Sequence, residues 1–113
     1  MSGRVLQFDL TQEDRALRAR AETTRAGRAA KTLVKDGPLR ITQIALVRGA
    51  ALSPHAVAAA VSVQVLRGRL LFDVDGRKIQ LRAGGLITLE ADTLHAARAL
   101  SDASLVLTAA MPS

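Results

Sequence analysis

Short runs of β-branched and aliphatic residues, separated by turn residues, recur along most of this chain. Asp36-Gly37 and Asp75-Gly76 each join two such runs, which is a strong hairpin signal, although Pro38 leaves the register of the first hairpin open. Turn residues return about every 8–12 positions, as in all-β sandwiches and barrels. The pattern therefore predicts an all-β fold. The expected strands cover residues 31–34, 39–46, 61–66, 69–74, 77–81, 86–89 and 104–108.

The first third of the chain has a different pattern, which is typical of a short helix. Thr11 is the expected N-cap, with Asp14 three residues later in a position similar to that of a capping box. The stretch up to residue 20 is rich in Ala, Arg and Glu, which helices tolerate or favour. Its apolar stripe is thin, so we expect the helix to pack on the outside of a larger unit. The stripe consists of Leu10, Leu17 and Ala21.

One segment, residues 53–60, carries conflicting signals. Ser53 is a good N-cap, Pro54 suits the first position of a helix, and four alanines favour the helix further. The residues that follow, Val-Ser-Val-Gln-Val, prefer a strand and would limit the helix to fewer than two turns. Helices that short are marginal. We therefore predict the end of a strand followed by a loop.

Composition limits the classes of protein that fit. The chain has 113 residues, which suits one domain, and its core must be built from Val, Leu, Ile and Ala, since Phe8 and Phe72 are its only aromatic residues. It has no cysteine, which excludes disulfides, thiolate metal sites and a cysteine nucleophile. No apolar run is long enough to span a bilayer or to form a signal peptide, so we expect a cytoplasmic location and no contact with membranes.

The net charge of +6 is unevenly distributed. Residues 1–35 hold eight basic and four acidic residues, whereas the remaining residues hold eight and six. A basic N-terminal arm is able to attract nucleic acid. However, no aromatic residues lie between its arginines to stack on bases. We therefore expect these charges to solvate the surface, and nucleic acid is an unlikely partner.

Two histidines lie in recognisable settings. The first ends the stretch Gly49-Ala-Ala-Leu-Ser-Pro-His55, and a strand downstream closes at Gly68. The second lies in a stretch that runs from Gly84 to His95. Together these stretches resemble the two sequence boxes of the cupin superfamily, G-x5-H-x-H-x3-4-E-x6-G and G-x5-P-x-G-x2-H-x3-N. The phrases VLRGRLLFDVDGRKIQLRAGG and LEADTLHAARAL are similar to those of small single-domain bacterial cupins.

This resemblance covers about residues 28–110 and implies a double-stranded β-helix, the jelly-roll barrel of cupins. It divides the chain into an N-terminal arm with a short helix, residues 1–27, and a cupin barrel, residues 28–113. The spacing supports it, because Gly49 and His55, and Gly84 and His95, are separated as in the two boxes. The boxes themselves are separated by fifteen residues, 69–83.

The usual cupin metal centre has three His and one Glu, and the resemblance carries over only two of these ligands, His55 and His95. Val57 stands where the second His is implied, and Val61 stands where the Glu is implied. The second box departs as well, because Glu90, Asp92 and Ala99 replace its Pro, Gly and Asn.

No other side chain is placed to complete a metal site. Strand alternation puts Val61, Val63 and Val65 on one face and Gln64 on the other, so Gln64 does not point toward the same pocket unless a bulge intervenes. Glu90 precedes His95 in a loop and can reach the rim. Two imidazoles are fewer ligands than zinc or iron enzymes use. We therefore expect no tightly bound cofactor, with a divalent transition metal on His55 and His95 as the alternative.

The motif implies a pocket in which two imidazoles face a wall of valines. Such a pocket suits a small, partly apolar ligand with a polar anchor, and a binding protein is the favoured function. The alternative is a metal-dependent cupin enzyme of the dioxygenase, isomerase or decarboxylase type, so enzymatic activity is left open. The catalytic residues are unknown. The expected pocket residues are His55, Val57, Val61, Val63 and His95.

We also expect a homodimer. About 85 residues of barrel, rich in small side chains, bury a modest core, and small domains are often marginal alone. Open sheet edges also need to be covered, and a second subunit covers them. Small cupins similar to this chain are commonly dimeric, with N-terminal segments at the interface.

Overall fold

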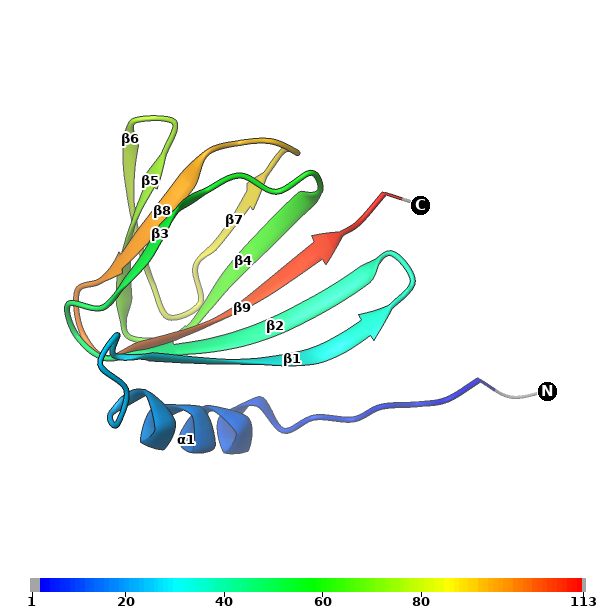
Figure 1. The fold of residues 1–113 in the computed structure, drawn as a ribbon, viewed down its shortest axis with the longest axis horizontal. Helices are drawn as coiled ribbons and strands as arrows, with labels where there is room; N and C mark the ends of the chain where they lie inside the picture. The colour runs from blue at the N-terminus through cyan, green and yellow to red at the C-terminus, as the bar shows by residue number, and fades with distance from the viewer. Residues whose placement is uncertain (1–2, 113) are drawn as a thin grey trace.

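The computed structural model describes residues 3–112, which form one helix and nine strands (Figure 1). In chain order these are α1 (Leu10–Ala21), β1 (Arg28–Asp36), β2 (Leu39–Leu46), β3 (Ala51–His55), β4 (Ala60–Arg67), β5 (Arg69–Val74), β6 (Arg77–Arg82), β7 (Leu86–Leu89), β8 (His95–Ala99) and β9 (Ala103–Ala110).

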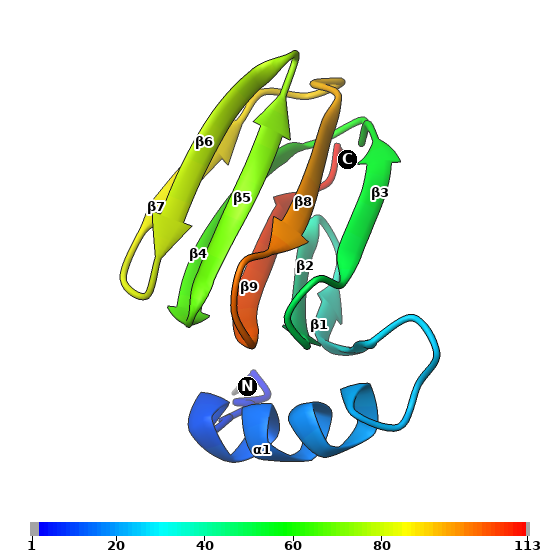
Figure 2. The same ribbon diagram turned by 90° about the vertical axis from the view of Figure 1, so that its left-hand side faces the viewer.

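The strands form two antiparallel sheets that face one another. The larger sheet has the order β1-β2-β9-β4-β7, and the smaller sheet has the order β3-β8-β5-β6. Figure 2 shows the smaller sheet from the outside, with the larger sheet behind it and α1 below. This is the jelly-roll arrangement, so the predicted all-β fold with one short helix is confirmed.

The core lies between the sheets and follows the alternation of the strands. Val61, Val63 and Val65 of β4 are buried, whereas Gln64 is exposed on the opposite face, as the parity of the strand predicts. Phe72 and Leu70 of β5 face these valines from the smaller sheet and are also fully buried. The interior is therefore filled by apolar side chains.

The strands β3 and β8 were not predicted as separate strands, and they are the two that carry the histidines. Their residues are mainly Ala, Ser, Pro and Arg, which have little β-propensity, so only pairing within the sheet makes them strands. Within residues 53–60 the structure has the end of β3, a loop over 56–59 and the first residue of β4. The prediction of a strand end and loop, rather than a helix, is confirmed.

The helix is present as predicted, but the prediction of its N-cap residue is wrong. Asp9, not Thr11, caps α1, because its carboxylate accepts hydrogen bonds from the backbone N–H groups of Thr11 and Gln12 at 3.0 and 3.1 Å. Thr11 instead lies in the first turn. The Asp9 carboxylate, one residue before the helix, accepts from two backbone N–H groups of the first turn that have no partner within the helix. Thr11 lies within that turn, so its side chain cannot accept from both of them.

The helix packs on the outer face of the larger sheet. Leu17 and Ala21 are buried against Ala29 and Ala45 of β1 and β2. Asp14 accepts a hydrogen bond from the guanidinium of Arg67 at 2.7 Å. The helix is therefore held on this sheet by a small apolar contact, by this ion pair and a second one between Glu13 and Lys31, and by a hydrogen bond from the Gln43 side chain to the carbonyl oxygen of Leu10. Within residues 3–112, no helix combines the length and apolar character needed to cross a membrane.

Both predicted hairpins are present, but one turn is shifted by a residue. Asp75 and Gly76 have φ values of 51° and 83°, as a two-residue hairpin turn of the favoured type requires. In the first hairpin, Asp36 pairs with Leu39, so the turn consists of Gly37 and Pro38 rather than Asp36 and Gly37. Gly37 has a φ of 54° and supplies the left-handed conformation, while Pro38 sits where no ladder N–H is needed.

Candidate functional site

His55 and His95 meet at one end of the molecule. His55 is the last residue of β3, His95 is the first of β8, and the two are cross-strand partners after an irregularity in the ladder. Their ring centroids are 4.3 Å apart, with an angle of 56° between the ring planes. His95 is only 6% exposed, whereas His55 is exposed at the surface. The spacing of the two boxes thus places both imidazoles at one site.

Each imidazole is oriented by its own strand. Nδ1 of His55 lies 3.0 Å from the carbonyl oxygen of Ser53, and Nδ1 of His95 lies 2.9 Å from that of Thr93. Because a carbonyl oxygen only accepts hydrogen bonds, both Nδ1 atoms must carry the proton. In the neutral ring, Nε2 then has a free lone pair. When both rings are neutral, both Nε2 atoms are hydrogen-bond acceptors.

The acceptor on His95 lacks a partner. Within the described part of the chain, its Nε2 is buried and accepts no hydrogen bond. An unsatisfied buried polar group costs about 1–3 kcal/mol, and such groups in native proteins call for an explanation. The ring of His55 beside it is itself an acceptor at Nε2, so it cannot satisfy its neighbour while both rings are neutral.

The cavity between the two histidines and the core is small, with a volume of about 20 Å³. That is room for about one water molecule. Of the valines expected to line a pocket here, only Val63 does so, while Val57 and Val61 pack elsewhere in the core. One of the three expected valines thus lines this cavity, and larger side chains such as Phe72 and Leu105 line it as well. The lining residues are Leu52, His55, Val63, Phe72, His95, Ala96, Ala97, Leu105 and Leu107.

A second hollow, with a volume of about 140 Å³, adjoins His95 at the rim. Leu94, which is half exposed, and Pro54 form apolar parts of its wall. Asp73 and Asp75 bring carboxylates to it, because Val74 between them pairs with His95 across β5 and β8. The sequence indicated this hollow only through the predicted Asp75-Gly76 turn. That turn does not reveal that the neighbouring strand is the one that carries His95.

Asp73 is not a free charge. Its carboxylate accepts a hydrogen bond from the ammonium group of Lys78 at 2.6 Å and another from the backbone N–H of Gly76 at 3.0 Å. The hydrogen bond from Lys78 holds the pKa of Asp73 below its ordinary value. Asp73 therefore stays ionised and paired, and Asp75 is the carboxylate left to interact with a ligand at this rim.

The residues of this site do not fit the usual metal centre of cupins. Val57 and Val61 offer no donor atom, and Gln64 points to the opposite face. Glu90 is exposed and lines a different hollow with Ser62 and Thr108. Within residues 3–112, no group of three or more His, Cys, Asp or Glu side chains is arranged to hold a metal ion. Two imidazoles fall short of the three or four protein ligands typical of such sites.

The fold that carries this site is the cupin fold. Neither a family model nor a curated protein matches the sequence. Solved structures do match it, and a cupin superfamily protein from Desulfitobacterium hafniense aligns with a TM-score of 0.73 and 15% identity, over 75% of this chain and 78% of that chain. The chain therefore folds as a small cupin domain, and the resemblance seen in its two boxes is confirmed at the level of the fold.

The other similar structures include a protein of unknown function, an enzyme and a domain of a regulator. A conserved protein of unknown function from Streptococcus pyogenes aligns over 99% of this chain and 92% of its own, with a TM-score of 0.78 and 23% identity. A variant of salicylate 1,2-dioxygenase from Pseudoaminobacter salicylatoxidans aligns over 91% of this chain but 34% of its own (TM-score 0.81, 19% identity). The cupin domain of a transcriptional regulator from Enterobacter cloacae aligns over 76% of this chain and 98% of its own, with a TM-score of 0.68 and 24% identity. Enzymes and regulatory domains thus share this scaffold.

Proposed function

We propose that this chain is a small-molecule-binding domain in which His55 and His95 together accept hydrogen bonds from one ligand. The observation that carries this proposal is the buried Nε2 atom of His95, which has no partner within the described residues and lies beside the exposed ring of His55. A ligand with a suitable donor satisfies this atom and recovers the free energy that its burial costs.

The size and chemistry of the site define the class of ligand. The cavity beneath the histidines admits only one small group, so the ligand inserts a hydroxyl or amine and keeps its body at the rim. There it contacts Leu94 and Pro54, and Asp75 offers a further acceptor. Because the polar groups nearest the histidines are acceptors, the ligand presents hydrogen-bond donors on a partly apolar body.

The first test is calorimetric titration of the protein with a monosaccharide, a diamine and a diphenol. We expect at least one to bind saturably, and His55→Ala and His95→Phe each to weaken that binding about tenfold, the factor that one lost hydrogen bond of about 1.4 kcal/mol gives. Glu90→Gln, which removes a charge outside the site, serves as the control and should bind as the original protein does. Equal binding by the histidine variants and the control, or no binding of any probe, would contradict the proposal.

The second candidate is a metal-dependent enzyme that uses the same histidines. Hydrogen bonds from Nδ1 to carbonyl oxygens are common in histidines that ligate metals, and both rings have them. The salicylate dioxygenase variant among the similar structures also suggests oxidative chemistry on this scaffold. The missing ligands favour the binding function over this candidate.

We therefore expect protein purified without a histidine tag to contain far less than one equivalent of Fe, Mn, Ni, Cu or Zn. Two imidazoles leave such an ion dependent on water for its remaining ligands, and the ion then exchanges freely during purification. Elemental analysis by mass spectrometry measures this directly. A near-stoichiometric metal that is lost in His55→Ala would reverse the order of the two candidates.

We also propose that the chain forms a homodimer. Val5 is 88% exposed in the N-terminal arm, which extends away from α1 (Figure 1), and Leu6 in the same arm is half exposed. The strand β1 is an edge of the larger sheet, and nine residues of open edge invite pairing. Light scattering at micromolar concentration should give about twice the chain mass of 11.9 kDa. A mass equal to that of one chain would refute the dimer.

A further inference from the structure

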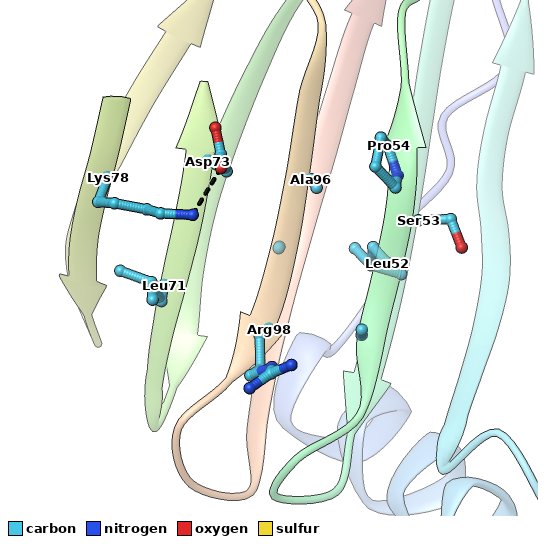
Figure 3. Close-up of a pocket in the computed structure, with 10 residues that line it drawn as sticks. Leu52, Ser53, Pro54, Leu71, Asp73, Lys78, Ala96 and Arg98 are labelled. Carbon is cyan, nitrogen blue, oxygen red and sulfur yellow. Dashed lines mark hydrogen bonds and ion pairs between the residues drawn. The ribbon is translucent and has the colours of Figure 1, made fainter. Parts of the chain in front are cut away.

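A groove larger than the two hollows beside the histidines lies on the outer face of the sheet that carries them. Its volume is about 440 Å³, and it runs along the outer face of β3, β8 and β5 (Figure 3). Small-molecule sites commonly have volumes of about 300–1,000 Å³, so this groove is large enough for one. It is lined by Ala51, Leu52, Ser53, Pro54, Leu71, Asp73, Lys78, Ala96, Ala97 and Arg98.

Strand alternation explains the shape of the groove. The buried residues of β8, such as Ala97, face the core, so the half-buried Ala96 and the exposed Arg98 face outward. Arg98 pairs with Ala51 of β3 on one side and with Leu71 of β5 on the other. The small side chains of Ala51 and Ala96 leave the hollow, while Leu71 makes part of its surface apolar. An apolar body of several carbon atoms fits on such a surface.

The charges around the groove are unbalanced. Figure 3 shows Arg98 at one end and the ion pair of Lys78 and Asp73 farther along. Among the residues that the structure describes, Asp73 is the only one that brings a carboxylate to the groove, and Lys78 already neutralises it. Arg98 is exposed and, within residues 3–112, forms no ion pair. The groove therefore offers one uncompensated guanidinium group.

Three further arginines lie on the strands next to that end of the groove, although none of them lines it. Arg69 and Arg82 are direct cross-strand partners in β5 and β6, a placement of like charges that destabilises a sheet. Neither forms an ion pair within the described residues. Arg28 donates a hydrogen bond to the carbonyl oxygen of Ala51 at 2.9 Å, and Ala51 is the cross-strand partner of Arg98. A further guanidinium group is thus held next to Ala51. An anion bound here reduces this mutual repulsion.

We infer that this groove binds a small organic anion, with an apolar body on Leu71 and Ala96 and a carboxylate or phosphate group on Arg98. The planar guanidinium group pairs well with either head group. A nucleic acid fits less well, because no aromatic side chain lines the groove to stack on bases. The groove shares Pro54, Asp73 and Ala96 with the rim hollow beside His95, whereas Arg98 and Leu71 line neither that hollow nor the cavity between the histidines. The inference rests on Arg98 and therefore does not depend on the proposed function.

The test is calorimetric titration with decanoate and decyl phosphate, which carry the two candidate head groups, and with decanol and decylamine as neutral and cationic controls. We expect at least one anion to bind saturably and about tenfold more tightly than either control, the scale of one charge-assisted hydrogen bond. The tighter anion identifies the head group.

Three variants locate the binding. We expect Arg98→Gln to weaken anion binding about tenfold, and Ala96→Leu to abolish it by filling the groove. Arg25→Gln, in the exposed connector after α1, is the matched control for the lost charge and should bind normally. Equal binding of all four amphiphiles, or equal effects of Arg98→Gln and Arg25→Gln, would overturn the inference. Binding of a duplex oligonucleotide with no binding of either anion would overturn it in favour of a nucleic-acid surface.

Discussion

Replacing Gly68 by alanine is expected to lower the free energy of unfolding by about 3–5 kcal/mol. Gly68 joins β4 to β5 with a φ of 75°, and a Cβ atom there would lie 2.1 Å from the carbonyl oxygen of Asp102 and 2.8 Å from Oγ of Ser101. Both neighbours lie in the connection from β8 to β9, and Oγ of Ser101 accepts the backbone hydrogen bond of Arg69 at 3.0 Å. The two connections cannot separate without losing that bond.

Chemical denaturation followed by far-UV circular dichroism measures this effect, since the chain has no tryptophan or tyrosine. Gly76→Ala is the matched control, because Gly76 has a φ of 83° but open space where its Cβ would lie. It should cost only the conformational penalty of about 1–2 kcal/mol. Equal losses for the two variants would show that the close approach at Gly68 does not constrain the fold.

Phe72→Ala is expected to destabilise the protein by about 3–5 kcal/mol, the usual cost of removing a buried aromatic side chain. Phe72 is 2% exposed, fills the space between the two sheets and lines the cavity beneath the histidines. Its loss enlarges that cavity, because the neighbouring strands are held in place by their ladders.

The only other phenylalanine, Phe8, provides the matched comparison for Phe72. Phe8 lies in the N-terminal arm and is 36% exposed, so Phe8→Ala should cost about 1 kcal/mol or less. The same denaturation experiment compares the two variants. A smaller loss for Phe72→Ala than for Phe8→Ala would mean that the core lies elsewhere.

The sequence predicted the long strands because their pattern depends on local alternation. Val61, Val63 and Val65 face the core as their positions predict, and Gln64 faces away from it. The Asp75-Gly76 turn was equally local, since a two-residue hairpin needs positive φ at both positions. These features were predictable because the pattern that produces each one lies within a few consecutive residues.

Features that depend on tertiary pairing were missed. The strands β3 and β8 have weak propensities, and only their mutual pairing and that of β8 with β5 defines them. The sequence could not distinguish Asp9 from Thr11 as the N-cap, because both have suitable side chains. Only the geometry of the helix selects Asp9. The turn at Gly37 and Pro38 depends on the register between β1 and β2.

The proximity of the two histidines was predicted from the sequence. The spacing of the two boxes indicated that His55 and His95 lie together, which the distance of 4.3 Å between their rings bears out. The volume of the cavity was not predictable, because it depends on how Phe72, Leu105 and Leu107 pack. The outer groove was equally hidden, since a stretch of Ala and Arg in β8 reveals no hollow until the neighbouring strands are known.

The most direct test of the shared acceptor site is long-range ¹⁵N–¹H correlation spectroscopy of the two imidazoles in labelled protein. The structure predicts that both neutral rings carry their proton on Nδ1, that nuclear Overhauser effects connect the two rings, and that a bound donor ligand shifts both Nε2 resonances. A proton on Nε2 of either neutral ring, or rings without mutual contact, would contradict the account.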